Sequence, residues 1–117
     1  MTLKAHFVAV DLGASNGRVM VGTWDGGTFS VEELHRFANG GVRVADGLYW
    51  NILGIWSQIQ LGLEKYHARY PQTPQGIAVD AWGVDFGLLD RAGRLIGNPR
   101  HYRDSRTDGI SQHVYET

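Results

Sequence analysis

Short apolar runs separated by turn-forming residues make up the N-terminal part of the chain. Residues 7–10 form a continuous apolar run of the kind found in buried strands. Residues 18–24 and 28–37 predict two further strands, because the Asp-Gly-Gly sequence at 25–27 favours a tight turn between them. We therefore expect an antiparallel meander of three strands.

A change of period marks the next element. Its apolar residues recur at spacings of three and four, as on one face of a helix: Ile52, Ile55, Trp56, Ile59, Leu63 and Tyr66. Asn51 is suited to cap the start of this helix, and Pro71 lies just beyond its end. Gly54 and Gly62 each cost about 1 kcal/mol relative to alanine inside a helix, so we expect them to mark close packing against the sheet.

The remaining segments complete an α/β pattern. Residues 77–79 form a second buried-type run, which predicts a strand parallel to the first and an element order β-β-β-α-β. Less regular segments are a break at 39–41, a short extended piece at 42–44, a turn at 46–47, a hairpin at 88–96, an irregular polar segment at 98–109 and the start of a helix at 111–117. The expected fold is a mixed sheet with the helix over one face.

The turn between the first two strands carries candidate chemistry. Asp11 follows the first apolar run, and residues 12–18 read Leu-Gly-Ala-Ser-Asn-Gly-Arg. We expect Gly13 and Gly17 to adopt backbone conformations closed to other residues and to let a ligand approach the main chain. Consecutive amide groups in such a turn can cradle a phosphate, and Asp11 can hold Mg²⁺ or its water shell. An ordinary hairpin with an exposed aspartate fits the same pattern, and no Walker A or Gly-x-Gly-x-x-Gly sequence is present.

Polar residues also follow the strand at 77–79. Asp80 occupies the position that Asp11 occupies after the first strand, and Asp85 follows shortly after. Solvated strand-end carboxylates and site residues are equally compatible with this pattern. We expect Phe86 to pack in the core. No histidine has metal-ligand spacing with a partner, so none is assigned to a metal.

Composition and charge narrow the class of protein. The chain has 117 residues, 43% of them hydrophobic, which is enough for one domain with a core. Eleven basic and 12 acidic side chains give a formal net charge of −1, which argues against a nucleic-acid or anionic-membrane partner and favours a small metabolite. Cysteine is absent, and no secretory or membrane-spanning segment is evident, so a cytoplasmic location is expected.

Four motifs in this order resemble one known family. They are the Asp11–Arg18 turn, His35-Arg36-Phe37 with Asn39-Gly40, Asp80-x-Trp82-Gly83-Val84-Asp85-Phe86, and His101-Tyr102-Arg103-Asp104-Ser105-Arg106-Thr107. The element order resembles the ribonuclease H-like lobe shared by sugar kinases, actin and Hsp70 chaperones. The motifs resemble the FGGY family of carbohydrate kinases, and in particular its members that phosphorylate L-rhamnulose. The resemblance covers essentially the whole chain.

The resemblance implies a protein of two lobes, of which residues 1–117 are most of the first, with the second absent. It places ATP at Gly13, Ala14, Ser15, Asn16, Gly17 and Arg18, Mg²⁺ at Asp11, and the sugar at Gly83, with Trp82 and Asp85 beside it. The catalytic base is expected beyond Thr117, so we expect this chain to be inactive alone. Such an incomplete lobe is expected to expose apolar surface and to self-associate.

Departures from the family pattern and rival functions are also considered. Asn16 stands where the family has a second serine, and Ala81 replaces the usual threonine, which affects the identity of the sugar more than the reaction type. Residues 102–106 alone describe an exposed loop with weak ion pairs, whereas in the family the corresponding loop borders the sugar cleft. The alternatives are another FGGY-type sugar kinase, a nucleotide switch of the same fold, and a two-metal nuclease that uses Asp11, Glu64 and Asp80.

Overall fold

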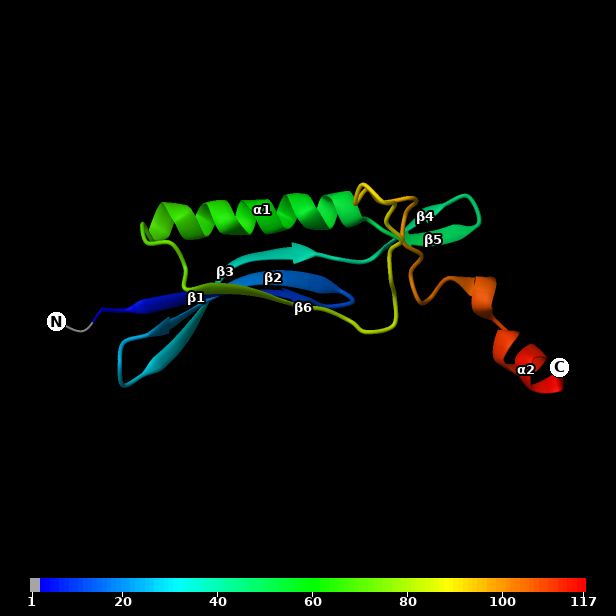
Figure 1. Cartoon of the computed structure of the whole chain (residues 1–117), viewed down its shortest axis with the longest axis horizontal. Helices are drawn as coiled ribbons and strands as arrows, with labels where there is room; N and C mark the ends of the chain where they lie inside the picture. The colour runs from blue at the N-terminus through cyan, green and yellow to red at the C-terminus, as the bar shows by residue number, and fades with distance from the viewer. Residues whose placement is uncertain (1–2) are drawn as a thin grey trace. The chain divides into compact units, whose positions relative to one another are not determined.

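The computed structural model describes residues 3–117, which form two compact units (Figure 1). Unit 1 comprises the residues up to Gly40 and Leu53–Trp82, and unit 2 comprises Gly41–Ile52 and Gly83–Thr117. Each unit is built from two separate stretches of chain. None of the helices in the described part of the chain is long and apolar enough to cross a membrane.

The sheet of unit 1 has the predicted topology. Its strands are β1 (Ala5–Leu12), β2 (Asn16–Trp24), β3 (Phe29–Ala38) and β6 (Gly76–Asp80), in the order β3-β2-β1-β6. The first three strands pair antiparallel, and β6 pairs parallel with β1. The α/β fold and the mixed sheet expected from the pattern are confirmed.

Helix α1 (Ile52–Arg69) begins directly after Asn51 and, from Leu53 on, lies along one face of this sheet (Figure 1). The alternation of β1 and β2 directs Val8, Val10, Val19 and Val21 to this face, where they form the core with Tyr66. Trp56, predicted on the buried face, is instead 57% exposed. The spacing of apolar residues predicts a wider buried stripe than the one that contacts the sheet, and Trp56 lies outside the contacting stripe.

Gly62 is the point of closest approach between α1 and the sheet. A Cβ atom built on Gly62 would lie 2.3 Å from Cγ2 of Val19, a fully buried residue of β2. The prediction that this glycine marks close packing is confirmed. Gly54 is only half-buried.

The opposite face of the sheet is open. Phe7, Met20 and Val31 come from three adjacent strands and line an apolar groove of about 360 Å³ that also includes Phe29. Phe7 of the inner strand β1 and Val31 of the edge strand β3 are 42% and 59% exposed, so this face presents large apolar side chains to solvent. This surface supports the expectation that the chain self-associates when alone, which stays a prediction.

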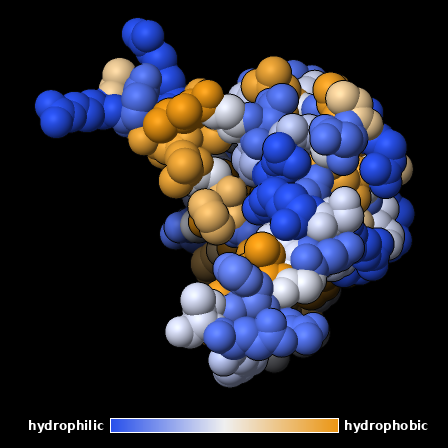
Figure 2. All heavy atoms as spheres, turned by 90° about the vertical axis from the view of Figure 1, so that its right-hand side faces the viewer, coloured by the Kyte–Doolittle hydropathy of each residue, from blue (hydrophilic) through white to orange (hydrophobic). Residues whose placement is uncertain are grey.

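Unit 2 contains less regular structure. It holds the hairpin of β4 (Gly41–Val44) and β5 (Gly47–Trp50), a 3₁₀ turn η1 (Ser105–Thr107) and helix α2 (Ile110–Glu116). The strand after the turn at 46–47 was not predicted. The hairpin expected at 88–96 is present: Leu89 pairs antiparallel with Leu95, the Ile96 N–H donates to the Leu88 carbonyl at 2.9 Å, and the Asp90 N–H donates to the Arg94 carbonyl at 2.8 Å. The space-filling view shows apolar patches among hydrophilic surface (Figure 2).

Candidate functional site

In unit 1, a row of charged residues crosses the end of the sheet. Asp11 of β1 is in register with Arg18 of β2 on one side and with Asp80 of β6 on the other. Arg18 donates a hydrogen bond from its guanidinium to Oδ2 of Asp11, forming an ion pair whose side chains are 37% and 36% exposed. Because Asp11 alternates with the buried Val10, this row lies on the open face of the sheet.

The turn after β1 is held by a residue from the end of β3. The Gly13 N–H donates to the carbonyl oxygen of Asn16 at 2.9 Å. Asn39 donates from Nδ2 to the Gly13 carbonyl at 2.7 Å and from its backbone N–H to the Ser15 carbonyl at 3.0 Å. Asn39 is only 6% exposed, so the turn is fixed in place by a buried amide.

The fixed turn leaves backbone donors available. Within residues 3–117, the amides of Ala14 and Ser15 donate to no protein group, and Ser15 is exposed. Consecutive N–H groups without a protein acceptor can donate to a phosphate oxygen. This arrangement is compatible with the phosphate-binding interpretation, which stays a prediction.

The expectation that the two glycines of this turn adopt backbone conformations closed to other residues is wrong, whereas the expected approach of a ligand to the main chain stays a prediction. Gly13 and Gly17 do not adopt the left-handed backbone, which among the described glycines is found at Gly26, Gly93 and Gly109. Instead, a Cβ on Gly17 would lie 2.2 Å from the ring of Phe37, and one on Gly13 would lie 2.9 Å from the Asn16 carbonyl oxygen. Steric room, not an unusual φ angle, requires glycine at both positions.

The same row of charged residues contains candidate metal ligands. Asp11 and Asp80 offer carboxylate oxygens, the ligands that Mg²⁺ prefers, but no group of three His, Cys, Asp or Glu side chains gathers within residues 3–117. Glu64 lies on α1, which covers the face opposite to Asp11. The three-carboxylate arrangement of the nuclease alternative is therefore not formed. Mg²⁺ at Asp11 would need further ligands from a bound phosphate and water.

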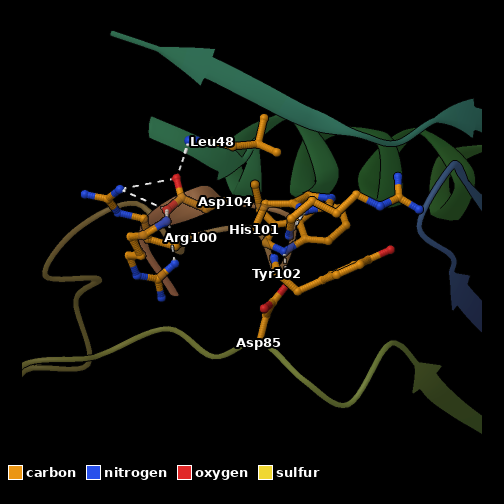
Figure 3. Close-up of polar contacts among 9 residues, drawn as sticks. Leu48, Asp85, Arg100, His101, Tyr102 and Asp104 are labelled. Atoms are coloured by element: carbon orange, nitrogen blue, oxygen red, sulfur yellow. Dashed lines mark hydrogen bonds and ion pairs between the residues drawn. The ribbon is translucent and has the colours of Figure 1, made fainter. Parts of the chain in front are cut away.

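In unit 2, Asp85 is held by two donors. The indole N–H of Trp50 donates to its Oδ2 at 2.5 Å, and the backbone N–H of Tyr102 donates to the same oxygen at 3.1 Å. Figure 3 shows Asp85 directed toward His101 and Tyr102. Asp85 also lines a cavity of about 240 Å³ that is bounded mostly by residues 84–88 and 96–100.

Three aromatic rings stack beside this carboxylate. The His101 ring lies 4.0 Å from that of Trp50 and 4.5 Å from that of Tyr102, measured between centroids. His101 is 2% exposed, and its Nδ1 accepts the backbone N–H of Arg103 at 3.0 Å. Burial lowers the pKa of His101, against the opposing charge of Asp85. The neutral ring therefore packs as part of the stack.

Asp104 fastens this segment to β5. Its carboxylate accepts the backbone N–H groups of Leu48 at 2.7 Å and Arg106 at 3.0 Å, and it pairs with Arg100 (Figure 3). The Leu48 and Arg106 amides are the main cause that lowers its pKa to about 2. The Asp104 side chain is 2% exposed, so it departs from the expected exposed loop, whereas the other residues of 102–106 are exposed. The buried Asp104 carboxylate is satisfied by hydrogen bonds from the Leu48 and Arg106 amides.

Asp104 predicts an acid-dependent loss of stability. Its pKa is lower in the folded protein than the ordinary 3.8, so its contribution is present above that value and is lost as the pH falls toward 2. Urea unfolding from neutral pH down to pH 2 should show this loss, and Asp104→Asn should be less stable at neutral pH with a shallower pH dependence. Asp46→Asn, a substitution in the exposed turn, should keep the original dependence. An unchanged dependence in Asp104→Asn would contradict the assignment.

The other predicted sugar-site residues lie in different units. Trp82 is a half-buried residue at the end of unit 1, and Gly83 begins the second segment of unit 2. A Cβ on Gly83 would meet no atom within 4 Å, so the space beside it is open. Phe86 is 71% exposed, so the expectation that it packs in the core is wrong. Asp80 is exposed.

Sequence reasoning missed Asn39 and Trp50 as parts of these arrangements. The nearest signal for Asn39 was the Asn-Gly-Gly sequence, which was interpreted only as a break and a family motif. Trp50 ends a short strand that the pattern did not predict. Its partner Asp85 is 35 residues away, a separation that periodicity does not reach.

Comparisons with known proteins show which sequences this chain is similar to. The chain is 41% identical to a rhamnulokinase of Klebsiella pneumoniae (strain 342) over 95% of its length, and 44% identical to one of Enterobacter sp. (strain 638) over 99%. It spans less than a quarter of these curated relatives, 23% and 24%. No protein-family model matches the chain.

Solved structures show the same fold. A gluconate kinase from Lactobacillus acidophilus superposes with a TM-score of 0.76 at 10% identity, over 97% of this chain and 23% of that one. A xylulose kinase from Rhodospirillum rubrum gives a TM-score of 0.67 at 15% identity, over 96% of this chain and 23% of that one. The chain is thus homologous to a part of rhamnulokinases and has the fold of a part of sugar kinases.

Proposed function

We propose that this chain is part of an ATP-dependent sugar kinase that converts L-rhamnulose to L-rhamnulose 1-phosphate. The observation that carries the proposal is the 41–44% identity to rhamnulokinases over nearly the whole chain. The turn after β1 gives independent support, because it combines free amides, an arginine and a carboxylate at one strand end.

The turn supplies the phosphate contacts in this proposal. The amides of Ala14 and Ser15 would donate to phosphate oxygens, with Gly13, Asn16 and Gly17 shaping the turn. Arg18 forms an ion pair with Asp11, and a phosphate would be a second anionic partner for its guanidinium. The carboxylates of Asp11 and Asp80 fit the oxygen preference of Mg²⁺, which when bound would neutralise part of the phosphate charge.

The sugar is assigned to Gly83, Trp82 and Asp85. The open space beside Gly83 would let hydroxyl groups reach the backbone, and the flat indole of Trp82 would contact the apolar edge of the sugar. Asp85 would accept a hydroxyl hydrogen bond. The departure at Ala81 removes a hydroxyl next to this segment, which bears on which ketose is preferred.

The proposed reaction is an in-line phosphoryl transfer, in which positioning and charge neutralisation provide most of the rate. We assign residues 1–117 to most of the first lobe and place the base that accepts the sugar proton in a part of the protein beyond Thr117. The relatives are more than four times as long as the region they share with this chain, which leaves room for a second lobe. This chain alone is then inactive.

The test is to sequence the reading frame beyond the codon for Thr117, to express the complete protein and to measure ADP release with and without sugars. Stimulation by L-rhamnulose above D-xylulose and gluconate supports the proposal. A stronger response to one of the other sugars identifies another FGGY-type kinase. ATP hydrolysis that no sugar changes favours a nucleotide switch, and a frame that stops at Thr117 contradicts the two-lobed enzyme.

A further inference from the structure

Trp50 has no role in the function proposed above, yet its position is tightly constrained. Its side chain lies at the end of β5 and is 3% exposed. Its backbone N–H donates to the Pro99 carbonyl at 2.9 Å, and its ring stacks on His101 at 4.0 Å with an interplanar angle of 28°. These contacts fix the direction of the indole N–H.

That N–H selects one of the two oxygens of Asp85. Trp50 Nε1 and the Tyr102 amide both donate to Oδ2, at 2.5 and 3.1 Å. Within the described residues 3–117, no hydrogen bond to Oδ1 is found. A carboxylate with two donors on one oxygen cannot rotate without losing both, so its second oxygen has a fixed direction.

The surroundings of Asp85 leave room for a ligand. Asp85 is only half-buried and lines the cavity of about 240 Å³. Gly83, two residues earlier, has open space where a side chain would be. The Asp85 oxygen that has no donor among the described residues is therefore available to accept a hydrogen bond from a ligand hydroxyl or from water.

We propose that Trp50 is a positioning residue of the sugar site: its indole N–H fixes Asp85 so that Oδ1 accepts a hydroxyl of the sugar. The proposal rests on the proposed function and assigns Trp50 a part in substrate affinity. Trp50 acts through Asp85 and does not itself touch the sugar in this arrangement.

The test compares steady-state kinetics of the complete protein with those of Trp50→Phe, which keeps an aromatic ring and removes the N–H. A hydrogen bond to a charged group is typically worth enough to change affinity by about 10-fold or more. We expect KM for L-rhamnulose to rise by about that factor, while KM for ATP and kcat change by less than about 3-fold. Trp56→Phe, the same substitution at an exposed position of α1, should change neither constant.

Asp85→Asn and the double variant separate positioning from packing. If Trp50 acts through Asp85, the double variant should have nearly the same sugar KM as Asp85→Asn alone. Additive effects, or an unchanged sugar KM in Trp50→Phe, would overturn the inference. If Trp50→Phe fails to fold, benzothienylalanine at position 50 keeps the ring shape without the N–H and should give the same rise in KM. Absence of sugar-dependent turnover in the unsubstituted protein would instead refute the proposed function, and this inference with it.

Discussion

Asp11→Asn in the complete protein should lower kcat by about 100-fold or more and change KM for the sugar by less than about twofold. Asparagine keeps the shape of the side chain but loses the charge that favours a cation beside the phosphates. Removing one preorganised electrostatic contact of this kind typically costs two or three orders of magnitude in turnover, or about 2.7 kcal/mol and more. The sugar is assigned to other residues, so its affinity should be preserved.

Stability should hardly change in Asp11→Asn. The lost ion pair with Arg18 is more than one-third exposed on both sides, and such pairs contribute about 1 kcal/mol or less. Asp46→Asn is the matched control, since it removes the same charge from an exposed turn, and it should behave as the unsubstituted protein. Steady-state kinetics at saturating ATP and Mg²⁺ measure kcat and the KM for the sugar in each variant. A weakened sugar affinity with normal turnover would show that Asp11 has a different role.

Gly62→Ala should lower the free energy of unfolding by about 1–3 kcal/mol, although alanine is the better helix former by about 1 kcal/mol. The added Cβ would lie 2.3 Å from Cγ2 and 2.6 Å from Cβ of Val19. Val19 is β-branched and fully buried, so it cannot turn away at low cost. Overpacking therefore outweighs the gain in helix propensity.

Urea unfolding of Gly62→Ala measures this effect, with Gly40→Ala as the control. A Cβ on Gly40 meets no atom within 4 Å, so that variant should have nearly unchanged stability. Adding Val19→Ala to Gly62→Ala should cost less than the sum of the two single changes, because the smaller side chain makes room for the new methyl group. Strict additivity, or a stabilised Gly62→Ala, would show that α1 does not contact the sheet at this point.

The fold was predictable from the sequence because its main elements depend on local periodicity. The apolar runs at 7–10 and 77–79 and the helical stripe from Ile52 to Tyr66 correspond to β1, β6 and α1. Periodicity could not predict that Trp56 is exposed, because the width of the buried stripe of a helix depends on what packs against it. The short strand β5 was missed because four residues carry too little pattern.

The parts of the candidate site that lie within one short segment were predictable from the sequence. The parts formed by residues far apart in the sequence were not. The Asp11–Arg18 turn was identified as a unit, but the reason for Gly17 lies in the ring of Phe37 on another strand. Asp104 was judged to be a surface charge because its main partner, the Leu48 amide, is 56 residues away. Contacts between side chains and backbone groups that lie this far apart in the sequence leave no trace in composition or spacing.

The division of each unit into two stretches of chain has a consequence for how the protein folds. Unit 2 needs residues 41–52 and 83–117 together, and the whole of β6 and nearly all of α1 come between them in the chain. While that intervening segment is unfolded, joining the two stretches requires closing a long flexible loop, which costs entropy. Folding of unit 1 fixes Gly40, Leu53 and Trp82, and thereby anchors the ends from which both stretches of unit 2 continue. We therefore expect the sheet and α1 to form before the Trp50–Asp85 and Asp104–Leu48 contacts, so that unit 2 folds last.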